Sequence, residues 1–179
     1  MKIQIITLFP EAVAATLDHS MLHKAVEQDL VTLEYVNLRD FGIGPRKQVD
    51  DTPYGGGAGM LLKPEPMFAA VEHCKETNPD AKVIMMTPRG TQYKQAVARK
   101  LSKESGLIIL CGHYEGFDER ILSIVDEEIS IGDFVLTGGE IPAMAIVDSV
   151  VRLLPGVLGD ARSSEEESFS QGLLEYGHY

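Results

Sequence analysis

The chain has 179 residues, of which 44% are hydrophobic and 24% charged, and its formal net charge is −11. This length and composition are enough for one compact domain with a hydrophobic core. The acidic balance argues against a free-standing protein that binds a phosphate backbone, because such proteins are usually basic. The sequence contains no run of about 18 apolar residues, so no membrane-spanning helix is predicted. The two cysteines, Cys74 and Cys111, lack metal-binding spacing, which indicates a reducing, cytoplasmic compartment.

The first third of the chain predicts two strands around a helix. An apolar strand is expected at 2–9, followed by a helix that begins at Pro10, where proline fits the first turn. Its apolar stripe runs through Val13, Leu17, Leu22 and Val26. A second strand is expected at 30–36. Residues 37–63 then show no period and include the glycine-rich run 55–59, and a connection this long is usually functional or disordered.

The rest of the chain continues the alternation. Further elements are expected as a helix at 64–76, a strand at 82–87, a helix at 93–102, strands at 107–111 and 128–131, a short apolar segment at 135–137, and a helix at 141–154. This order predicts an α/β fold with a mainly parallel sheet and flanking helices. The acidic stretch 163–168 predicts a linker or mobile loop.

Three of the predicted strands lead into loops that contain glycine or proline, at 87–90, 112–116 and 131–140. Ligands of open parallel sheets bind beyond the carboxyl ends of the strands, and glycine lets a ligand approach the backbone. Each loop alone is explained more simply as a tight turn, but three of them favour a ligand site whose ligand they do not identify. Dinucleotide, phosphate-loop and serine-hydrolase motifs are absent. The histidines show no metal-binding spacing, so no metal site is predicted.

Four long segments resemble the TrmD family of bacterial tRNA methyltransferases, which belongs to the SPOUT class. They are ITLFP at 6–10, VDDTPYGGGAGM at 49–60, CGHYEGFDER at 111–120 and SIGDFVLTGGE at 130–140. The resemblance implies an α/β domain whose C-terminal part forms a deep trefoil knot. It also implies transfer of a methyl group from S-adenosyl-L-methionine to N1 of guanine 37 in tRNA, by a homodimer, and the family is associated with Mg²⁺. Each active site of such a dimer takes its cofactor from one subunit and catalytic loop residues from the other.

The resemblance also assigns site residues. Glu167, where the family usually has aspartate, would be the general base, and Arg152 would stabilise charge on the guanine O6. Without the resemblance, Glu167 belongs to a solvated acidic run and Arg152 is a cation at a helix end. The loop with Asp50, Gly55 and Gly59 would bind the target base. The cofactor would be held by Met86, Thr87, Pro88, Gly112, Tyr114, Glu115, Gly116, Ile131, Gly132, Asp133, Phe134, Val135, Leu136, Gly138 and Gly139.

The resemblance further divides the chain into a cofactor-binding catalytic domain at 1–159 and an active-site loop and interdomain linker at 160–179. Family members normally continue into a helical tRNA-binding domain, so a fragment with weakened tRNA binding is expected. Arg46, Lys47 and Arg120 are the cations expected to meet phosphate. Two alternatives stay open: a knotted dimer that binds S-adenosylmethionine without acting on RNA, and a different SPOUT RNA methyltransferase. The segments 49–60 and 167–169 favour the tRNA guanine enzyme over the latter.

Overall fold

A five-stranded parallel sheet organises the molecule, with its strands in the order β2-β1-β6-β5-β7. The computed structural model describes residues 1–158, 168, 169 and 174. The strands are β1 (Lys2–Thr7), β2 (Thr32–Asn37), β5 (Lys82–Gln92), β6 (Gly106–Leu110) and β7 (Glu127–Ser130). Every pairing between neighbouring strands of this sheet is parallel, which confirms the predicted fold class of a mainly parallel α/β sheet.

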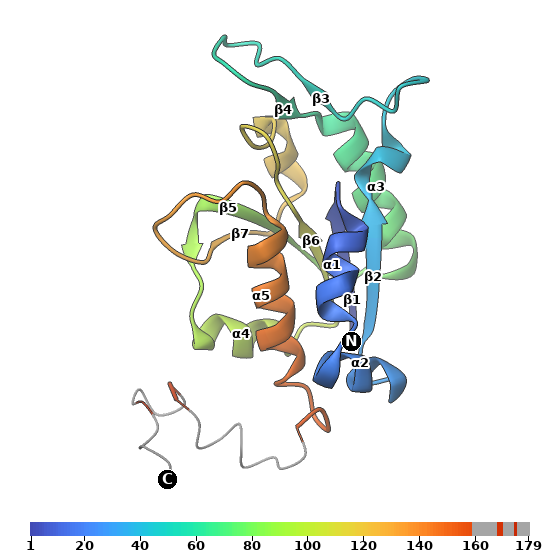
Figure 1. The fold of residues 1–179 in the computed structure, drawn as a ribbon, viewed down its shortest axis with the longest axis vertical. Coiled ribbons are helices and arrows are strands. Elements are labelled where there is room, and N and C mark those ends of the chain that lie inside the picture. Colours follow the sequence, from blue (N-terminus) through green and yellow to red (C-terminus); the bar gives the residue numbers. More distant parts are fainter. Residues whose placement is uncertain (159–167, 170–173, 175–179) are drawn as a thin grey trace.

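Helices cover both faces of the sheet (Figure 1). On one face lie α1 (Pro10–Leu17), α2 (Ser20–Glu27), α4 (Gln95–Leu101) and α5 (Glu140–Val151). On the other face lie α3 (Pro64–Thr77) and the 3₁₀ helices η1 (Leu38–Phe41) and η2 (Glu119–Ile124). In the centre, β6 (GLIIL) is buried along its whole length, as expected for a strand covered on both faces.

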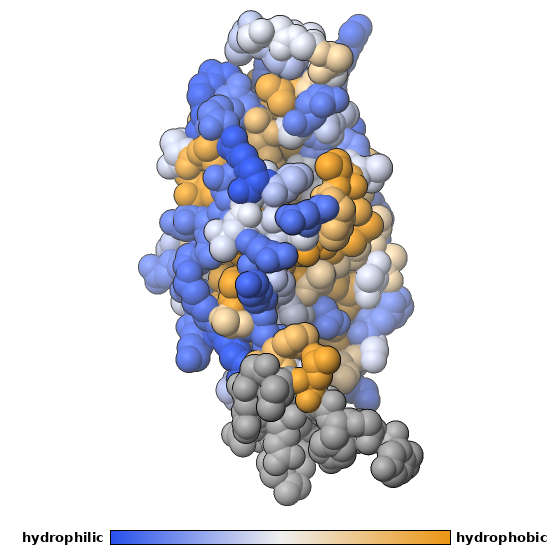
Figure 2. Space-filling view, turned by 90° about the vertical axis from the view of Figure 1, so that its left-hand side faces the viewer, coloured by the Kyte–Doolittle hydropathy of each residue, from blue (hydrophilic) through white to orange (hydrophobic). Residues whose placement is uncertain are grey.

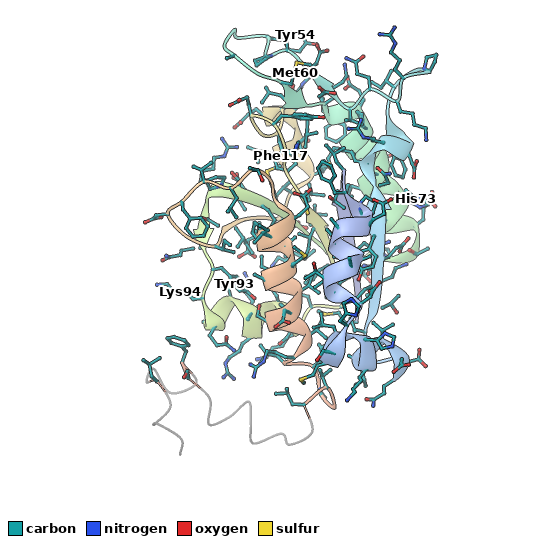
Figure 3. The ribbon with its side chains drawn as sticks, viewed as in Figure 1. Tyr54, Met60, His73, Tyr93, Lys94 and Phe117 are labelled. Carbon is teal, nitrogen blue, oxygen red and sulfur yellow. The ribbon has the colours of Figure 1, made fainter. Side chains whose placement is uncertain are left out.

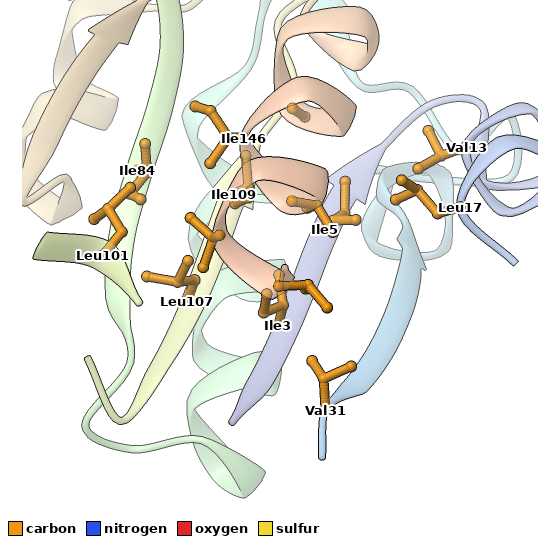
Figure 4. Packing of buried hydrophobic residues seen from close by; sticks show 14 of the residues in the cluster. Ile3, Ile5, Val13, Leu17, Val31, Ile84, Leu101, Leu107, Ile109 and Ile146 are labelled. Carbon is orange, nitrogen blue, oxygen red and sulfur yellow. The ribbon is translucent and has the colours of Figure 1, made fainter. Parts of the chain in front are cut away.

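Successive side chains of the central strands enter two different cores. Ile3, Ile5 and Ile109 pack with helix residues such as Val13 and Ile146 on the α5 side (Figure 4). Ile6, Ile108 and Leu110 point to the opposite side, where α3 contributes Met67, Ala70, Val71 and Cys74. Because neighbouring side chains of a strand alternate between faces, each short apolar strand supplies both cores.

The single helix expected from Pro10 to Val26 is wrong, since two short helices occupy that stretch. Backbone conformation ends the first helix: His19 is extended, with φ −134° and ψ 161°, and Ser20 has a positive φ of 53°. This break lets both helices keep apolar residues against the same core, with Val13 and Leu17 from α1 and Ala25 from α2.

One strand was predicted with the wrong end. The strand predicted to stop at 87 continues to Gln92, because the chain leaves the ladder and then returns to it. Met86 and Thr91 both pair with Ile129, so residues 87–90 form a bulge where Pro88 has no backbone N–H to offer a partner strand. The apolar segment 135–137 forms no strand and lies in the loop between β7 and α5, where Val135 is 84% exposed.

The irregular segment 37–63 forms an arm at one end of the sheet (Figure 1). It contains a two-stranded antiparallel sheet of β3 (Asp50–Asp51) and β4 (Leu61–Leu62), and an isolated bridge joins Ile43 to Gln48. Among the described residues, no helix is long and apolar enough to cross a membrane.

Candidate functional site

A cavity of about 360 Å³ opens at the carboxyl ends of β6 and β7 and beside residues 85–89 within β5. Its walls come from the bulge of β5, from the loop that follows β6, and from the loop between β7 and α5. All but one of the residues expected to hold the cofactor line it, the exception being the exposed Asp133. The predicted residues in the wall are Met86, Thr87, Pro88, Gly112, Tyr114, Glu115, Gly116, Ile131, Gly132, Phe134, Val135, Leu136, Gly138 and Gly139.

Two glycines let these loops touch backbone to backbone. A Cβ atom on Gly139 would lie 2.7 Å from the backbone nitrogen of Gly112, and the Gly139 N–H donates a hydrogen bond of 2.8 Å to the Gly112 carbonyl. A Cβ atom on Gly90 would lie 2.4 Å from the backbone nitrogen of Ile129. Since no side chain fits at either position, these glycines hold the loop after β6 against α5 and the β5 bulge against β7.

The loop after β6 places a strained residue at the mouth of the cavity. Tyr114 has a positive φ of 59°, a conformation that costs on the order of 1–3 kcal/mol outside glycine and is frequent at ligand sites. Its ring lies edge-on to His113, at a centroid distance of 4.9 Å, and is partly exposed.

His113 brings an unpaired polar atom to the cavity wall. Its Nδ1 is buried and has no hydrogen-bond partner among the described residues. The position that a Cβ on Gly138 would occupy is only 3.1 Å from this nitrogen. Buried polar atoms are usually paired, so an unpaired nitrogen in a residue that lines the cavity marks this wall as a candidate ligand site. The residue stands in the segment 111–120, but its role was not predicted from the sequence.

An ion-pair cluster lies at the rim and was also missed by the sequence prediction. Arg89 donates through Nε to Glu128 at 2.9 Å and through a terminal nitrogen to Glu119 at 3.1 Å. Hydrogen bonds to Glu128 and then to Glu119 raise the pKa of Arg89. These contacts tie the β5 bulge to β7 and η2. Both Arg89 and Glu119 line the cavity, and the only sequence signal was the position of Arg89 in the predicted loop 87–90.

The face shown in Figure 2 has apolar patches separated by polar side chains. Among the described residues, large apolar side chains remain exposed in the β7–α5 loop and at the start of α5, including Phe134 and Ile141. The described part of the chain contains no group of three or more histidine, cysteine or acidic side chains placed to hold a metal ion.

The two expected catalytic residues lie apart from the cavity or outside the described residues. Arg152 is the C-terminal cap of α5, whereas Gly139, in the cavity wall, is its N-terminal cap. At 1.5 Å per residue these two caps are about 20 Å apart. Within one chain, the C-terminal end of α5 therefore lies away from the loops that form the cavity. Glu167 lies outside the described residues.

The arm contacts the cavity loop through its backbone. The Glu115 N–H donates to the Met60 carbonyl at 3.0 Å, and the Leu62 N–H donates to the Gly116 carbonyl at 2.9 Å. Gly59 belongs to this contact, since a Cβ there would lie 2.4 Å from Cγ of Glu115. The other two predicted substrate residues lie further out on the arm, Asp50 within β3 and Gly55 in the open loop that follows it.

Two of the three cations expected to meet phosphate are already paired with carboxylates. Arg120 forms hydrogen bonds of 2.9 and 2.8 Å with Asp118 and lowers the pKa of that carboxyl, and Lys47 pairs with Asp40 at 3.1 Å. Arg46 has no ion pair within the described residues. The three cations together therefore offer less uncompensated positive charge than the sequence suggests.

The known proteins that this chain resembles are tRNA guanine methyltransferases. The family model described as tRNA (Guanine-1)-methyltransferase TrmD matches residues 1–179. A curated tRNA (guanine-N(1)-)-methyltransferase of Carboxydothermus hydrogenoformans is 56% identical over 180 residues, covering 100% of this chain and 70% of that protein. The protein of the same name from Geobacillus kaustophilus is 53% identical, over 100% of this chain and 74% of that protein.

A solved structure is similar as well. The crystal structure of tRNA (m1G37) methyltransferase from Aquifex aeolicus superposes with a TM-score of 0.84 at 39% sequence identity. The match covers 95% of this chain and 78% of that chain.

Proposed function

Because the chain belongs to the TrmD family and is a tRNA (guanine-N1)-methyltransferase, we propose that it transfers the methyl group of S-adenosyl-L-methionine to N1 of guanine 37. The cavity formed by three loops carries the proposal. Its position at the carboxyl edge of a parallel sheet is where such folds bind ligands, and its volume lies in the range of small-molecule sites.

The cavity residues fit a nucleoside cofactor. Apolar side chains such as Met86, Ile131 and Leu136 match the flat faces of adenine, while loop backbone groups match its polar edge. His113, whose Nδ1 is unpaired among the described residues, lines the same cavity, and glycine at 138 keeps a further side chain out of this wall. When bound, S-adenosylmethionine supplies a methyl group on a positively charged sulfur.

The substrate atom requires activation by the protein. N1 of guanine carries a proton and attacks carbon poorly until that proton leaves. Glu167 would accept the proton, as a carboxylate general base does. Arg152 would stabilise the negative charge that then develops on O6. The nitrogen lone pair forms the new bond to the methyl carbon while the bond from carbon to sulfur breaks, so the sulfur keeps the electron pair.

The position of Arg152 supports assembly as a homodimer. Because Arg152 and the cavity lie at opposite ends of α5, a complete site needs the Arg152 end of a second copy near the cavity of the first. In this proposal the C-terminal part also forms the deep trefoil knot of the family. A requirement for Mg²⁺ stays a prediction.

Calorimetric titration with S-adenosylmethionine tests the cofactor site. We expect binding in the micromolar range and at least a tenfold loss in Leu136→Trp, because the larger side chain would occupy the cavity. Ile141→Trp is the matched control, since Ile141 is an exposed apolar residue close by that does not line the cavity. Binding that is unaffected by Leu136→Trp would contradict the proposed site.

A methylation assay tests the reaction itself. Methyl groups from labelled S-adenosylmethionine should enter a tRNA with guanine at position 37 and should not enter the same tRNA with adenine there. Cofactor binding without any transfer would favour the alternative of a dimer that binds the cofactor without acting on RNA. Equal transfer to both tRNAs would indicate a different RNA methyltransferase.

A further inference from the structure

Tyr54 is the most exposed large hydrophobic residue among those described, with 86% of its surface accessible. It stands near the outer end of the arm, beyond Met60, and Phe117 lies further in, toward the sheet (Figure 3). A single exposed apolar side chain is ordinary on a protein surface, so the exposure of Tyr54 is informative only together with the contacts that hold its ring.

The ring of Tyr54 is supported on one side. The guanidinium carbon of Arg120 lies 5.8 Å from the ring centroid, within the range of a cation–π contact. Asp118 fixes that guanidinium with two hydrogen bonds, of 2.9 and 2.8 Å. The high exposure of Tyr54 leaves the rest of the ring open to solvent. One part of the Tyr54 ring therefore contacts Arg120, and the rest of its surface is accessible to a planar ligand that could stack on it.

The electrostatics of this region favour a planar ligand over a phosphate group. A shallow cavity of about 20 Å³ beside Tyr54 is lined by Arg120 and Lys63, but each cation already has a carboxylate partner. Lys63 pairs with Asp51 at 3.1 Å, and Arg120 pairs with Asp118 at 2.8 Å. Because the positive charges are compensated, the attraction that remains for a nucleic acid is stacking on the ring, which every base provides.

Backbone hydrogen bonds connect the arm that carries Tyr54 to the loop of the 360 Å³ cavity. The arm is joined to the cavity loop through the backbone of Met60 and Leu62, and the Asp118 N–H also donates to the Leu62 carbonyl at 3.0 Å. Residues 55–57 form an open turn after Tyr54, where Gly56 and Gly57 have positive φ and no neighbours within 4 Å of a Cβ. A strand of RNA can therefore approach the ring closely.

We propose that Tyr54, backed by Arg120, is a stacking platform for a nucleobase of the tRNA that neighbours the methylated guanine. This inference rests on the proposed function, since it takes tRNA as the substrate. It assigns to Tyr54 the role of holding the flanking nucleotide while the target base enters the cavity. The platform binds the RNA and takes no part in the methyl transfer.

Steady-state kinetics and tRNA binding of Tyr54→Ala and Tyr54→Phe test the platform. Loss of one stacked base should raise KM and Kd for tRNA by about 5- to 100-fold in Tyr54→Ala, with kcat and the S-adenosylmethionine Kd unchanged. Tyr54→Phe keeps the ring and should stay close to the unaltered protein. Ile43→Ala, which removes an exposed apolar side chain from another loop of the arm, is the control and should change none of these values.

Abasic substrates identify the stacked nucleotide. With an abasic residue on one side of the target guanine, Tyr54→Ala should raise the KM for tRNA no further, while the increase in KM should persist with the abasic residue on the other side.

Three results would overturn the platform: an unchanged tRNA KM in Tyr54→Ala, an equal rise in KM in Tyr54→Phe, or a full rise in KM on both abasic tRNAs. If the unaltered chain neither binds nor methylates tRNA, the proposed function fails together with the platform. If the unaltered chain is active and Tyr54→Ala matches it, only the platform fails.

Discussion

Two adjacent glycines in the cavity wall have different surroundings. A Cβ on Gly139 would meet backbone atoms of Cys111 and Gly112 at 2.8 and 2.7 Å, and neither backbone can move without disturbing β6. A Cβ on Gly138 would meet the end of the Glu140 side chain at 2.4 Å, so this carboxylate, which accepts a 2.7 Å hydrogen bond from Thr7 through its other oxygen, would have to shift. The two adjacent glycines therefore differ in role: Gly139 allows two backbone segments to pack, and Gly138 lies in the cavity wall beside a side chain.

This contrast predicts separate effects for two alanine substitutions. Gly139→Ala should lower the free energy of unfolding by about 1–3 kcal/mol, because the new methyl group forces two backbone segments apart. Gly138→Ala should destabilise less than Gly139→Ala, because a side-chain end and not a backbone segment must shift, and should weaken S-adenosylmethionine binding severalfold, because its methyl group lies beside His113 at the cavity wall. Urea unfolding and calorimetric titration of both variants measure the two effects. Equal destabilisation of both would show that the two positions are packed alike.

At the scale of single residues, motif recognition predicted most of the cavity wall but none of the contacts within it. The glycines and apolar residues of 131–140 were expected near a ligand because loops after parallel strands share one edge of the sheet. His113 and Arg89 were not assigned roles. Their importance depends on an unpaired buried nitrogen and on two carboxylates distant in the sequence, and neither is encoded in a local pattern.

At the scale of elements, the interruption of the β5–β7 ladder at the β5 bulge forms part of the cavity wall. The chain leaves the ladder after Met86 and re-enters it at Thr91, which turns four residues into a wall of the cavity. The sequence showed Pro88 and Gly90, and both usually end a strand. That the strand resumes depends on β7 lying alongside to accept it, a tertiary pairing that periodicity does not reveal. The break between α1 and α2 was missed for a different reason, because it depends on the backbone conformation of His19 and Ser20, which the apolar stripe does not reveal. Strands as apolar as β6 were predicted correctly.

The ion pairs of Arg89 with Glu128 and Glu119 should hold the β5 bulge in place in the cavity wall. Each partly exposed ion pair contributes about 0.2–1 kcal/mol, so losing both in Arg89→Met should weaken S-adenosylmethionine binding by at most about 2- to 30-fold and leave kcat at saturation unchanged. Lys100→Met removes an ion pair with Glu127 of the same strand, β7, and serves as a control away from the cavity. The exchange of charges in Arg89→Glu with Glu128→Arg should restore part of the affinity. If Lys100→Met weakens binding equally, the effect is general destabilisation of β7.

At the scale of the whole molecule, α5 separates the two halves of the proposed site. The N-terminal end of the helix lies in the cavity wall, and its C-terminal cap is Arg152. The sequence did predict this helix, at 141–154, and its length alone sets a separation of about 20 Å between the two ends. The distance became informative only once the structure showed where the cavity lies relative to the helix. A site that needs both ends must then be built from two copies, each contributing one half.

This arrangement predicts that two inactive variants restore activity when they are combined. Leu136→Trp should block the cavity and Arg152→Ala should remove the cation, so each homodimer should lack methylation activity. After the two chains are refolded together in equal amounts, about half of the dimers are mixed, and each mixed dimer has one intact site and one that carries both defects. About a quarter of the activity of the unaltered protein should therefore return.

Two differently tagged chains, purified in succession over both tags, would isolate the mixed dimers for this measurement. If such dimers form but stay inactive, Arg152 does not complete the cavity of the partner copy. If no mixed dimers form while the unaltered chain methylates tRNA as a monomer, the site must close within one chain. The residues beyond 158 would then have to supply what Arg152 cannot, because the rigid length of α5 keeps that side chain away from its own cavity.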